Sequence, residues 1–260
     1  MYLVGTAGFK YEYWRDVFYP QNLASKNMLA YYATQFQTLE VDYTYYRMPY
    51  ARTLAAMSDK VPAEFQFCIK AHKSMTHEIS ETQAERQETF SQFMSAVEPL
   101  RERAQLGCVL VQFPWSFKPA QHTHAYIQCL PRLCDGAPLV IEFRNNMWAT
   151  SDTFALLEDC GIGFCCVDEP RLKGLMPPLA RATSHVGYVR FHGRNAASWW
   201  KHNSVSERYN YLYSEQELLE WVPKIRLLGE SCSKVFVAFN NCYEGKAPTN
   251  ARMMQQILTE

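Results

Sequence analysis

Eight short apolar runs recur along the chain and alternate with segments of helical character. The runs have strand length and are rich in β-branched and aromatic residues. They lie at residues 2–6, 38–42, 65–70, 108–113, 139–144, 162–168, 187–193 and 234–240. Eight strand–helix repeats imply a parallel sheet, and that number most economically closes into a (β/α)8 TIM barrel.

The helical character between the runs is clearest in three segments. Residues 25–36 carry apolar residues at helical spacing behind Ser25, a candidate N-cap. Residues 83–104 form a long charged segment. In residues 213–228 the helical pattern starts on Ser214, with Glu217 three residues on, which predicts a capping box.

The length fits one barrel better than two small domains, so we expect a single domain over residues 1–260. The sixth repeat is the weakest, because residues 169–184 are too rich in proline for a long helix. The longest non-helical connection, residues 194–214, follows the seventh strand. In a barrel such a loop lies on the catalytic face.

Composition and charge argue against several classes of protein. With 26 basic and 26 acidic residues the net charge is zero, which argues against electrostatic nucleic-acid binding. No apolar run is long enough to span a membrane, and the first residues lack a signal-peptide pattern. The nine cysteines are scattered without C-x-x-C spacing. We therefore expect a reduced, cytoplasmic protein with no membrane partner.

A polar residue stands near the carboxyl end of seven of the eight predicted strands. Side chains alternate between the two faces of a strand, so each of these residues shares a face with the residue two positions before it. In a barrel they converge at the top of the interior, where active sites of this fold are built. The competing interpretation is an ion-pair network that stabilises the barrel top. The residues are Glu40, Asp42, Lys70, Gln112, Glu142, Arg144, Asp168, Arg190, His192 and Asn240.

The mixture of charges favours an anionic ligand held by guanidinium groups. Three cations among the carboxylates argue against a metal cage, because divalent metals prefer carboxylates and histidines without competing cations. The cofactor is not predicted. A metal-assisted variant, subordinate to the anion site, would use Glu40, Glu142, Asp168 and His192 as ligands.

We assign catalytic proton transfer to Glu40 and Glu142, helped by His192. Lys70 could also form an imine, but neighbouring carboxylates would keep it protonated, so anion binding is favoured. Aromatic residues near the strand ends could stack on a base or a sugar, or simply pack under the loops. The predicted substrate-binding residues are Lys70, Gln112, Arg144, Asp168, Arg190, Asn240, Asn241 and His77.

A set of motifs resembles the YecE-like family, the domain of unknown function seventy-two. The motifs are GTAGF, LEVDYTYYRMP, FCIKAHKSMTH, LVQFPWSF, VIEFRNNMW, YVRFHGR and FNNCYEGKAPTNA, and they span essentially the whole chain. The family opening is commonly GTSGW, so Ala7 and Phe9 depart from it. The resemblance implies a TIM barrel, similar to endonuclease-four-like and xylose-isomerase-like barrels, and implies little about chemistry.

Two functions follow as hypotheses. The first is an enzyme of hydrolase or lyase type that acts on a small polar, anionic substrate containing phosphate or sugar, at the carboxyl ends of the strands. The second is a nucleic-acid-binding or repair-associated module on the same face, without turnover of its own. A closed polar pocket would favour the first, and a basic stripe leading out of the mouth would favour the second.

Overall fold

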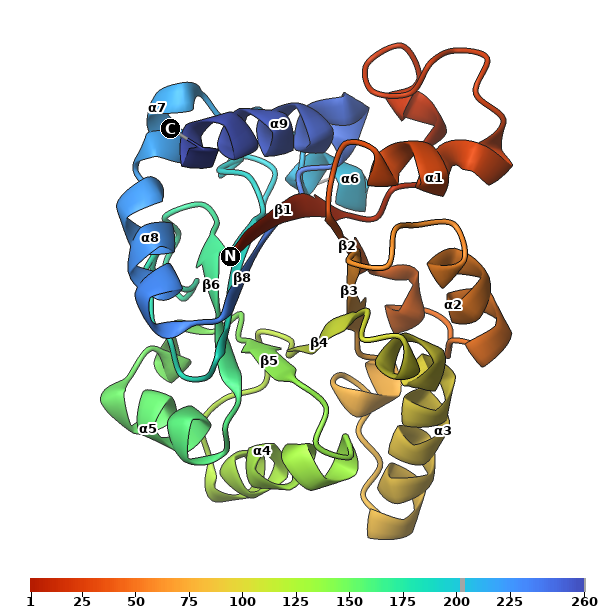
Figure 1. Ribbon diagram of the computed structural model, residues 1–260. Coiled ribbons are helices and arrows are strands. Elements are labelled where there is room, and N and C mark those ends of the chain that lie inside the picture. Colours follow the sequence, from red (N-terminus) through yellow and green to blue (C-terminus); the bar gives the residue numbers. More distant parts are fainter. Residues whose placement is uncertain (202–203, 260) are drawn as a thin grey trace.

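The eight predicted strands form one closed parallel barrel in the computed structural model, which describes residues 1–201 and 204–259. Each strand pairs with the next, and the first pairs with the last (Figure 1). The strands are β1 Tyr2–Ala7, β2 Thr38–Val41, β3 Gln66–Lys70, β4 Leu106–Gln112, β5 Leu139–Glu142, β6 Gly163–Asp168, β7 Val186–Phe191 and β8 Lys234–Phe239. The TIM-barrel prediction is confirmed.

Helices surround the strand ring on its outer side (Figure 1). Their apolar faces pack on strands whose outward residues are also apolar, as expected when a parallel sheet is covered. The helices are α1 Met28–Ala33, α2 Ala51–Ser58, α3 Gln83–Glu102, α4 Gln121–Leu133, α5 Ser151–Asp159, α6 Val205–Arg208, α7 Glu215–Leu219, α8 Val222–Ser231 and α9 Lys246–Thr259. Within the described residues, none of them has the length and apolar character that crossing a membrane requires.

Two details of the predicted helices are corrected. Ser25 does not cap α1, because a short 3-10 turn precedes that helix and the Ser25 hydroxyl donates to Glu12 instead. The segment behind Ser214 divides into α7 and α8, with Pro223 in the first turn of the second helix. The capping box between Ser214 and Glu217 is present.

The irregular connections lie where the sequence predicted them. Residues 169–185, between β6 and β7, contain no helix. The connection 194–214 is mainly irregular and includes α6, although its residues 202–203 lie outside the described part of the chain. Gly193 begins this connection with a φ of +89°, and a Cβ there would meet Tyr211 at 2.7 Å. A glycine is therefore required for the turn out of β7.

Two aromatic rings lie inside the barrel below its polar layer. The ring centroids of Tyr188 and Phe236 lie 5.8 Å apart. A Cβ on Gly107 would lie 2.6 Å from the ring of Phe236, so glycine makes room for that ring. The Tyr188 phenol donates a hydrogen bond of 2.9 Å to Glu40. The polar layer of the barrel therefore lies directly above the aromatic one.

Candidate functional site

The polar strand ends form a buried layer centred on Arg190 of β7. Its Nε and Nη2 donate to the two carboxylate oxygens of Glu40 at 2.9 and 2.6 Å, and its Nη1 donates to Glu142 at 2.5 Å. The side chains of all three residues are almost completely buried. Buried charges persist when they are paired and hydrogen-bonded, as these are. Arg190 thus ties β7 to β2 and β5 across the barrel.

Two further donor side chains contact the carboxylate of Glu142 in β5. Arg144 Nε lies 2.6 Å from its Oε1, and His192 Nε2 lies 3.2 Å from the same oxygen. Burial alone would raise the pKa of Glu142, but Arg144 and Arg190 hold it well below its usual range. The carboxylate is therefore ionised and accepts every bond it makes.

His192 is held as one neutral tautomer. Asn240 Nδ2 donates to His192 Nδ1 at 3.0 Å, so the ring proton lies on Nε2 and points to Glu142. Complete burial, with the nearby Arg144 charge, lowers the pKa of His192 to about 3. The imidazole therefore stays uncharged near neutral pH.

The three residues to which the sequence assigned proton transfer lie beneath the cavity and not on its wall. Both oxygens of Glu40 and of Glu142 are occupied by donors from the protein. His192 is completely buried, as are the Glu40 and Glu142 side chains. Groups enclosed in this way reach a substrate through the arginines and Asn240 above them. The geometry therefore favours a positioning role for Glu40, Glu142 and His192.

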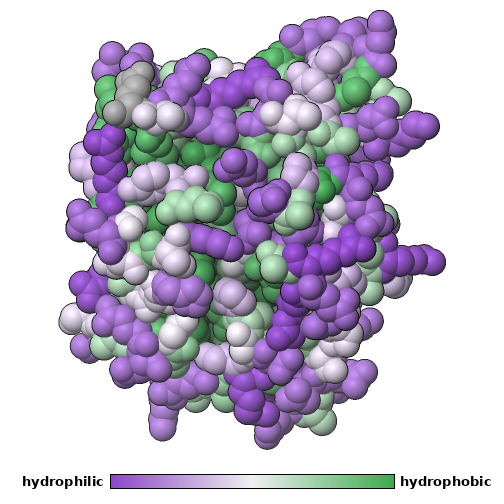
Figure 2. Space-filling model, in the orientation of Figure 1, coloured by the Kyte–Doolittle hydropathy of each residue, from purple (hydrophilic) through white to green (hydrophobic). Residues whose placement is uncertain are grey.

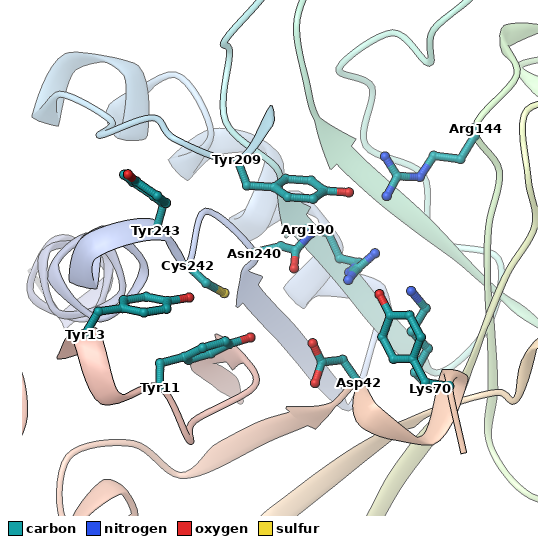
Figure 3. A pocket seen from close by; sticks show the side chains of 11 residues that line it. Tyr11, Tyr13, Asp42, Lys70, Arg144, Arg190, Tyr209, Asn240, Cys242 and Tyr243 are labelled. Carbon is teal, nitrogen blue, oxygen red and sulfur yellow. The ribbon is translucent and has the colours of Figure 1, made fainter. Parts of the chain in front are cut away.

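Above this layer opens a cavity of about 200 Å³ at the carboxyl ends of the strands. Figure 3 shows the side chains of Asp42, Lys70 and Arg190 directed toward its centre, with the Tyr209 ring across from them. The cavity is small enough to enclose a compact ligand. It is lined by Tyr11, Tyr13, Asp42, Tyr46, Lys70, Arg144, Arg190, Tyr209, Asn240, Cys242 and Tyr243.

Asp42 is the carboxylic acid that faces the cavity. It follows β2 on the same face as Glu40, one step nearer the mouth. Burial and the neighbouring Glu40 charge raise the pKa of Asp42. No cation among the described residues pairs with its carboxylate within 4 Å. Asp42 is therefore available to exchange a proton with a bound molecule.

Lys70, the last residue of β3, carries the ammonium group that lacks a carboxylate partner in the cavity. Its Nζ lies 4.7 Å from the centroid of the Tyr45 ring, and no carboxylate of the described residues lies within 4 Å of it. Burial and the Arg190 charge lower the pKa of Lys70 to about 8. A substantial fraction of the amine is therefore neutral at mildly alkaline pH.

A second cavity of about 290 Å³ adjoins the first and shares Tyr46, Lys70, Arg144 and Tyr209 with it. Its walls include three tryptophans, whereas no tryptophan is among the described residues that line the first cavity. His77 and Gln112, both predicted as substrate-binding, line the second cavity. Burial, together with Lys70 and Arg144, lowers the pKa of His77 to about 4, so the ring is neutral. The remaining lining is Tyr45, Pro114, Trp115, Leu175, Trp199, Trp200 and Arg208.

Asp168 lies apart from the other predicted residues. Its carboxylate accepts from Arg194 Nε and Nη2, both at 2.9 Å, from the Tyr213 phenol at 2.8 Å, and from Trp221 Nε1 at 2.7 Å. These partners belong to the connection after β7 and to the neighbouring helices. Asp168 therefore links these partner residues, which form an outer layer around the strand ring, to β6. It borders neither cavity.

Asn241 also turns away from the cavities. Its amide nitrogen donates to the carbonyl of Tyr211 at 2.8 Å and to Asn250 at 2.9 Å. It is completely buried, whereas the preceding Asn240 lines the first cavity. Of the two asparagines that follow β8, Asn240 is the one placed for a ligand.

The metal-assisted variant requires ligands that the structure keeps apart. Asp168 faces the outer layer, and the Arg190 guanidinium lies between Glu40 and Glu142. Across residues 1–201 and 204–259, no three histidine, cysteine or acidic side chains come together in a way that could hold a metal ion. The four residues proposed as ligands therefore do not form a metal site.

Several residues of the first cavity are absent from those assigned roles from sequence: Tyr11, Asp42, Tyr209 and Tyr243. For Asp42 a signal existed, since period-two alternation places it beside Glu40. The tyrosines come from irregular connections and short turns. No periodicity predicts where such side chains point.

The fold and these cavities define a (β/α)8-barrel protein with a polar site at the carboxyl ends of its strands. The chain belongs to the family described as Protein of unknown function DUF72, whose model matches residues 3–260. The family resemblance seen in the sequence motifs is confirmed.

Relatives support both the family and the fold. The chain is 32% identical over 255 residues to the UPF0759 protein YunF of Bacillus subtilis (strain 168), covering 94% of this chain and 90% of that protein. It is similar to the crystal structure of TM1631, a DUF72 family protein from Thermotoga maritima MSB8, with 36% identity, a TM-score of 0.91 and full coverage of both chains. The DUF72 family protein EF0366 of Enterococcus faecalis V583 gives 26% identity and a TM-score of 0.88, covering 100% of this chain and 96% of that one.

Proposed function

We propose that this protein is an enzyme of the hydrolase or lyase type that acts on a small anionic substrate in the barrel-mouth cavity. The observation that carries the proposal is that Lys70, an ammonium group without an ion pair among the described residues, and Asp42, a partly buried carboxyl group with a raised pKa, line the same cavity. Catalytic groups with shifted pKa values in a concave polar site are typical of enzymes.

The charge balance of the site supports an anionic ligand. In the buried layer, Arg190 and Arg144 offset Glu40 and Glu142. Lys70 then makes no ion pair within 4 Å among the described residues, and the Asp42 carboxyl group of the same cavity has a raised pKa, which favours its neutral form. A phosphate or carboxylate group in the cavity would supply a counter-ion for Lys70 and would also reach Arg144, which keeps some exposure to the cavity.

Six of the residues that line the two cavities have a role in this proposal. Lys70 and Arg144 bind the anionic group, and Asn240 donates a hydrogen bond to the ligand. Asp42 gives and takes a proton, because a raised pKa places a carboxyl group near its working range. Gln112 and His77 contact the part of a larger substrate that extends into the second cavity. Such a substrate contains phosphate or sugar.

The chemistry of the walls points to hydrolysis or elimination, because both reactions need a proton donor, a proton acceptor and charge stabilisation. The groups that provide these functions are already present among the lining residues. We place the protein in the cytoplasm, which fits its nine free cysteines.

A nucleic-acid-binding module is the second candidate. Trp115 and Trp200 border the second cavity and are 43% and 54% exposed, so their rings could stack on bases. The first cavity is small, about 200 Å³, and its walls mix acidic with basic side chains, which favours the small-molecule proposal, because a nucleic acid needs a track lined by cations.

Thermal denaturation in the presence of candidate ligands separates the two. Inorganic phosphate, glucose 6-phosphate and adenosine monophosphate form one group of ligands, and a short single-stranded oligonucleotide forms the other. We expect at least one small anion to raise the melting temperature of the unmodified protein. The gain should vanish in Lys70→Met and persist in Lys234→Met, whose lysine lies at the opposite end of the barrel and donates to Gln66.

Two results count against the proposal. Stabilisation by the oligonucleotide alone, lost when Trp115 and Trp200 are changed to alanine, would transfer the support to the nucleic-acid module. Equal stabilisation of the Lys70 and Lys234 variants by phosphate would place the anion outside the cavity.

A further inference from the structure

We infer that Lys70 is a covalent nucleophile, which forms an imine with a small carbonyl compound that carries a carboxylate or phosphate group. This inference rests on the proposed function, since it assigns a chemical step and a substrate class to the same cavity. Four features of the site support it: the position of the amine, its surroundings, a proton carrier, and a place for the anionic group.

The position of Lys70 suits attack on a bound molecule. It ends β3 at the carboxyl side of the barrel and is one of the residues that the two adjoining cavities share. A carbonyl carbon held at Lys70 could extend one substituent into each cavity. Figure 3 shows the Lys70 amine directed into the first cavity, near Asp42 and Arg190.

The surroundings of Lys70 favour the neutral amine, which is the nucleophilic form. Three carboxyl groups could hold the proton on Nζ. Arginines occupy Glu40 and Glu142, and the raised pKa of Asp42 favours its neutral form. The expectation that these carboxylates would keep Lys70 protonated is therefore not supported by the contacts. Burial beside another cation is a recognised way to activate a lysine for imine formation.

Asp42 supplies the proton transfers that the step requires. The neutral amine adds its electron pair to the carbonyl carbon, the carbon–oxygen π bond opens, and a carbinolamine forms after one proton moves from nitrogen to oxygen. Loss of that hydroxyl as water, protonated by the Asp42 carboxyl group, gives the protonated imine, which returns one proton from nitrogen to the Asp42 carboxylate. One amine and one carbonyl group thus yield one imine and one water molecule, with no oxidant or reductant.

The anionic group of the substrate has a defined place. Arg144 Nε is engaged by Glu142 at 2.6 Å, while its Nη1 meets Glu169 only at 3.4 Å. The outer edge of this guanidinium is therefore available to a carboxylate or phosphate in either cavity. The substrate class that fits is a 2-oxo acid, or a ketone or aldehyde that carries a phosphate.

Reductive trapping tests the inference. The unmodified full chain is incubated with pyruvate, or with dihydroxyacetone phosphate, and then reduced with sodium borohydride. Peptide mass spectrometry should find one adduct on Lys70, a 1-carboxyethyl group in the pyruvate sample. The two probes also distinguish a carboxylate from a phosphate as the preferred anion. The yield should rise with pH, reach about half of its plateau near pH 8, where half of the amine is neutral, and level off at higher pH.

Two variants serve as controls. Lys70→Arg keeps the positive charge and cannot form an imine, so it should show no adduct at this position. Lys73→Arg changes a neighbouring lysine that pairs with Glu78 at 2.9 Å, and it should label like the unmodified protein. Labelling spread evenly over exposed lysines, or no Lys70 adduct with either probe, overturns the inference.

The failure of the inference can be told apart from the failure of the proposed function. Thermal stabilisation by phosphate that depends on Lys70, without trapping by either carbonyl probe, refutes the imine and leaves the anion site standing. If phosphate stabilisation and trapping are both absent, both proposals are refuted.

Discussion

Replacing Arg190 by methionine tests whether the buried layer holds the barrel together. Methionine keeps much of the side-chain volume and removes the guanidinium. Three hydrogen bonds to two buried carboxylates are lost, those of 2.9, 2.6 and 2.5 Å. Glu142 keeps Arg144 and His192, whereas Glu40 keeps only the Tyr188 phenol. The variant therefore leaves one buried carboxylate without a cation.

The expected loss follows from that unpaired charge. Breaking a buried ion pair by removing one partner costs about 3–5 kcal/mol. We expect Arg190→Met to lower the free energy of unfolding by about that amount at pH 7. The double variant Arg190→Met, Glu40→Gln lacks the unpaired charge. Its free energy of unfolding should therefore be roughly 2 kcal/mol higher than that of Arg190→Met alone.

Urea denaturation followed by tryptophan fluorescence measures these differences. The matched control is Arg181→Met, because Arg181 forms an ion pair of the same length, 2.6 Å, with Glu158, while both side chains are 40% exposed or more. An exposed pair contributes about 0–1 kcal/mol, so the control should remain near the unmodified protein. If Arg190→Met loses no more than that control, or if Glu40→Gln deepens the loss, the account of the buried layer is wrong.

Three further predictions concern protonation and the outer layer. The pKa of Lys70 in the folded protein, about 8, lies below its usual 10.5. At pH 7 the charged form of Lys70 is therefore less favourable in the folded protein than in the unfolded chain, which lowers the free energy of unfolding. Lys70→Met should therefore raise the melting temperature at pH 7, and the gain should shrink as the pH rises from 8 toward 10.5. Burial raises the pKa of Glu169 to about 7, so the unmodified protein loses stability as the pH rises from 4.5 through 7. Glu169→Gln should lack this loss, and urea midpoints at pH 5 and pH 8 would show it. Asp168→Asn should lower the free energy of unfolding by about 3 kcal/mol while leaving phosphate-induced stabilisation of the remaining folded protein unchanged, since Asp168 borders neither cavity.

The barrel could be predicted from sequence because strand length and repeat number were both visible in the apolar runs. Period-two alternation also correctly paired Arg190 with His192, whose side chains both turn inward. The same rule correctly gave Asp168 the face of Cys166, but that face is the outer one. Strands of a parallel barrel are apolar on both faces, so alternation alone does not tell which face lies inside.

The sequence also did not show whether each polar residue lies beneath the cavity or on its wall. Glu40 and Asp42 share a face, yet the first is sealed by Arg190 and the second borders the cavity. Likewise Glu142 lies beneath the cavity and Arg144 on its wall. Two residues of one strand end can thus belong to the buried layer or to the site. The register between neighbouring strands and the loops above them determine to which of the two a residue belongs. Neither can be read from the sequence of one strand.

The central claim is that a small anion binds at Lys70 and Arg144 in the barrel mouth. A crystal structure of the protein soaked in phosphate tests it most directly. The account predicts phosphate density in the cavity lined by Asp42, Lys70 and Arg144, within hydrogen-bond distance of both cations, and no such density in a Lys70→Met crystal. Phosphate found only elsewhere on the protein, or bound identically in the variant, would contradict it.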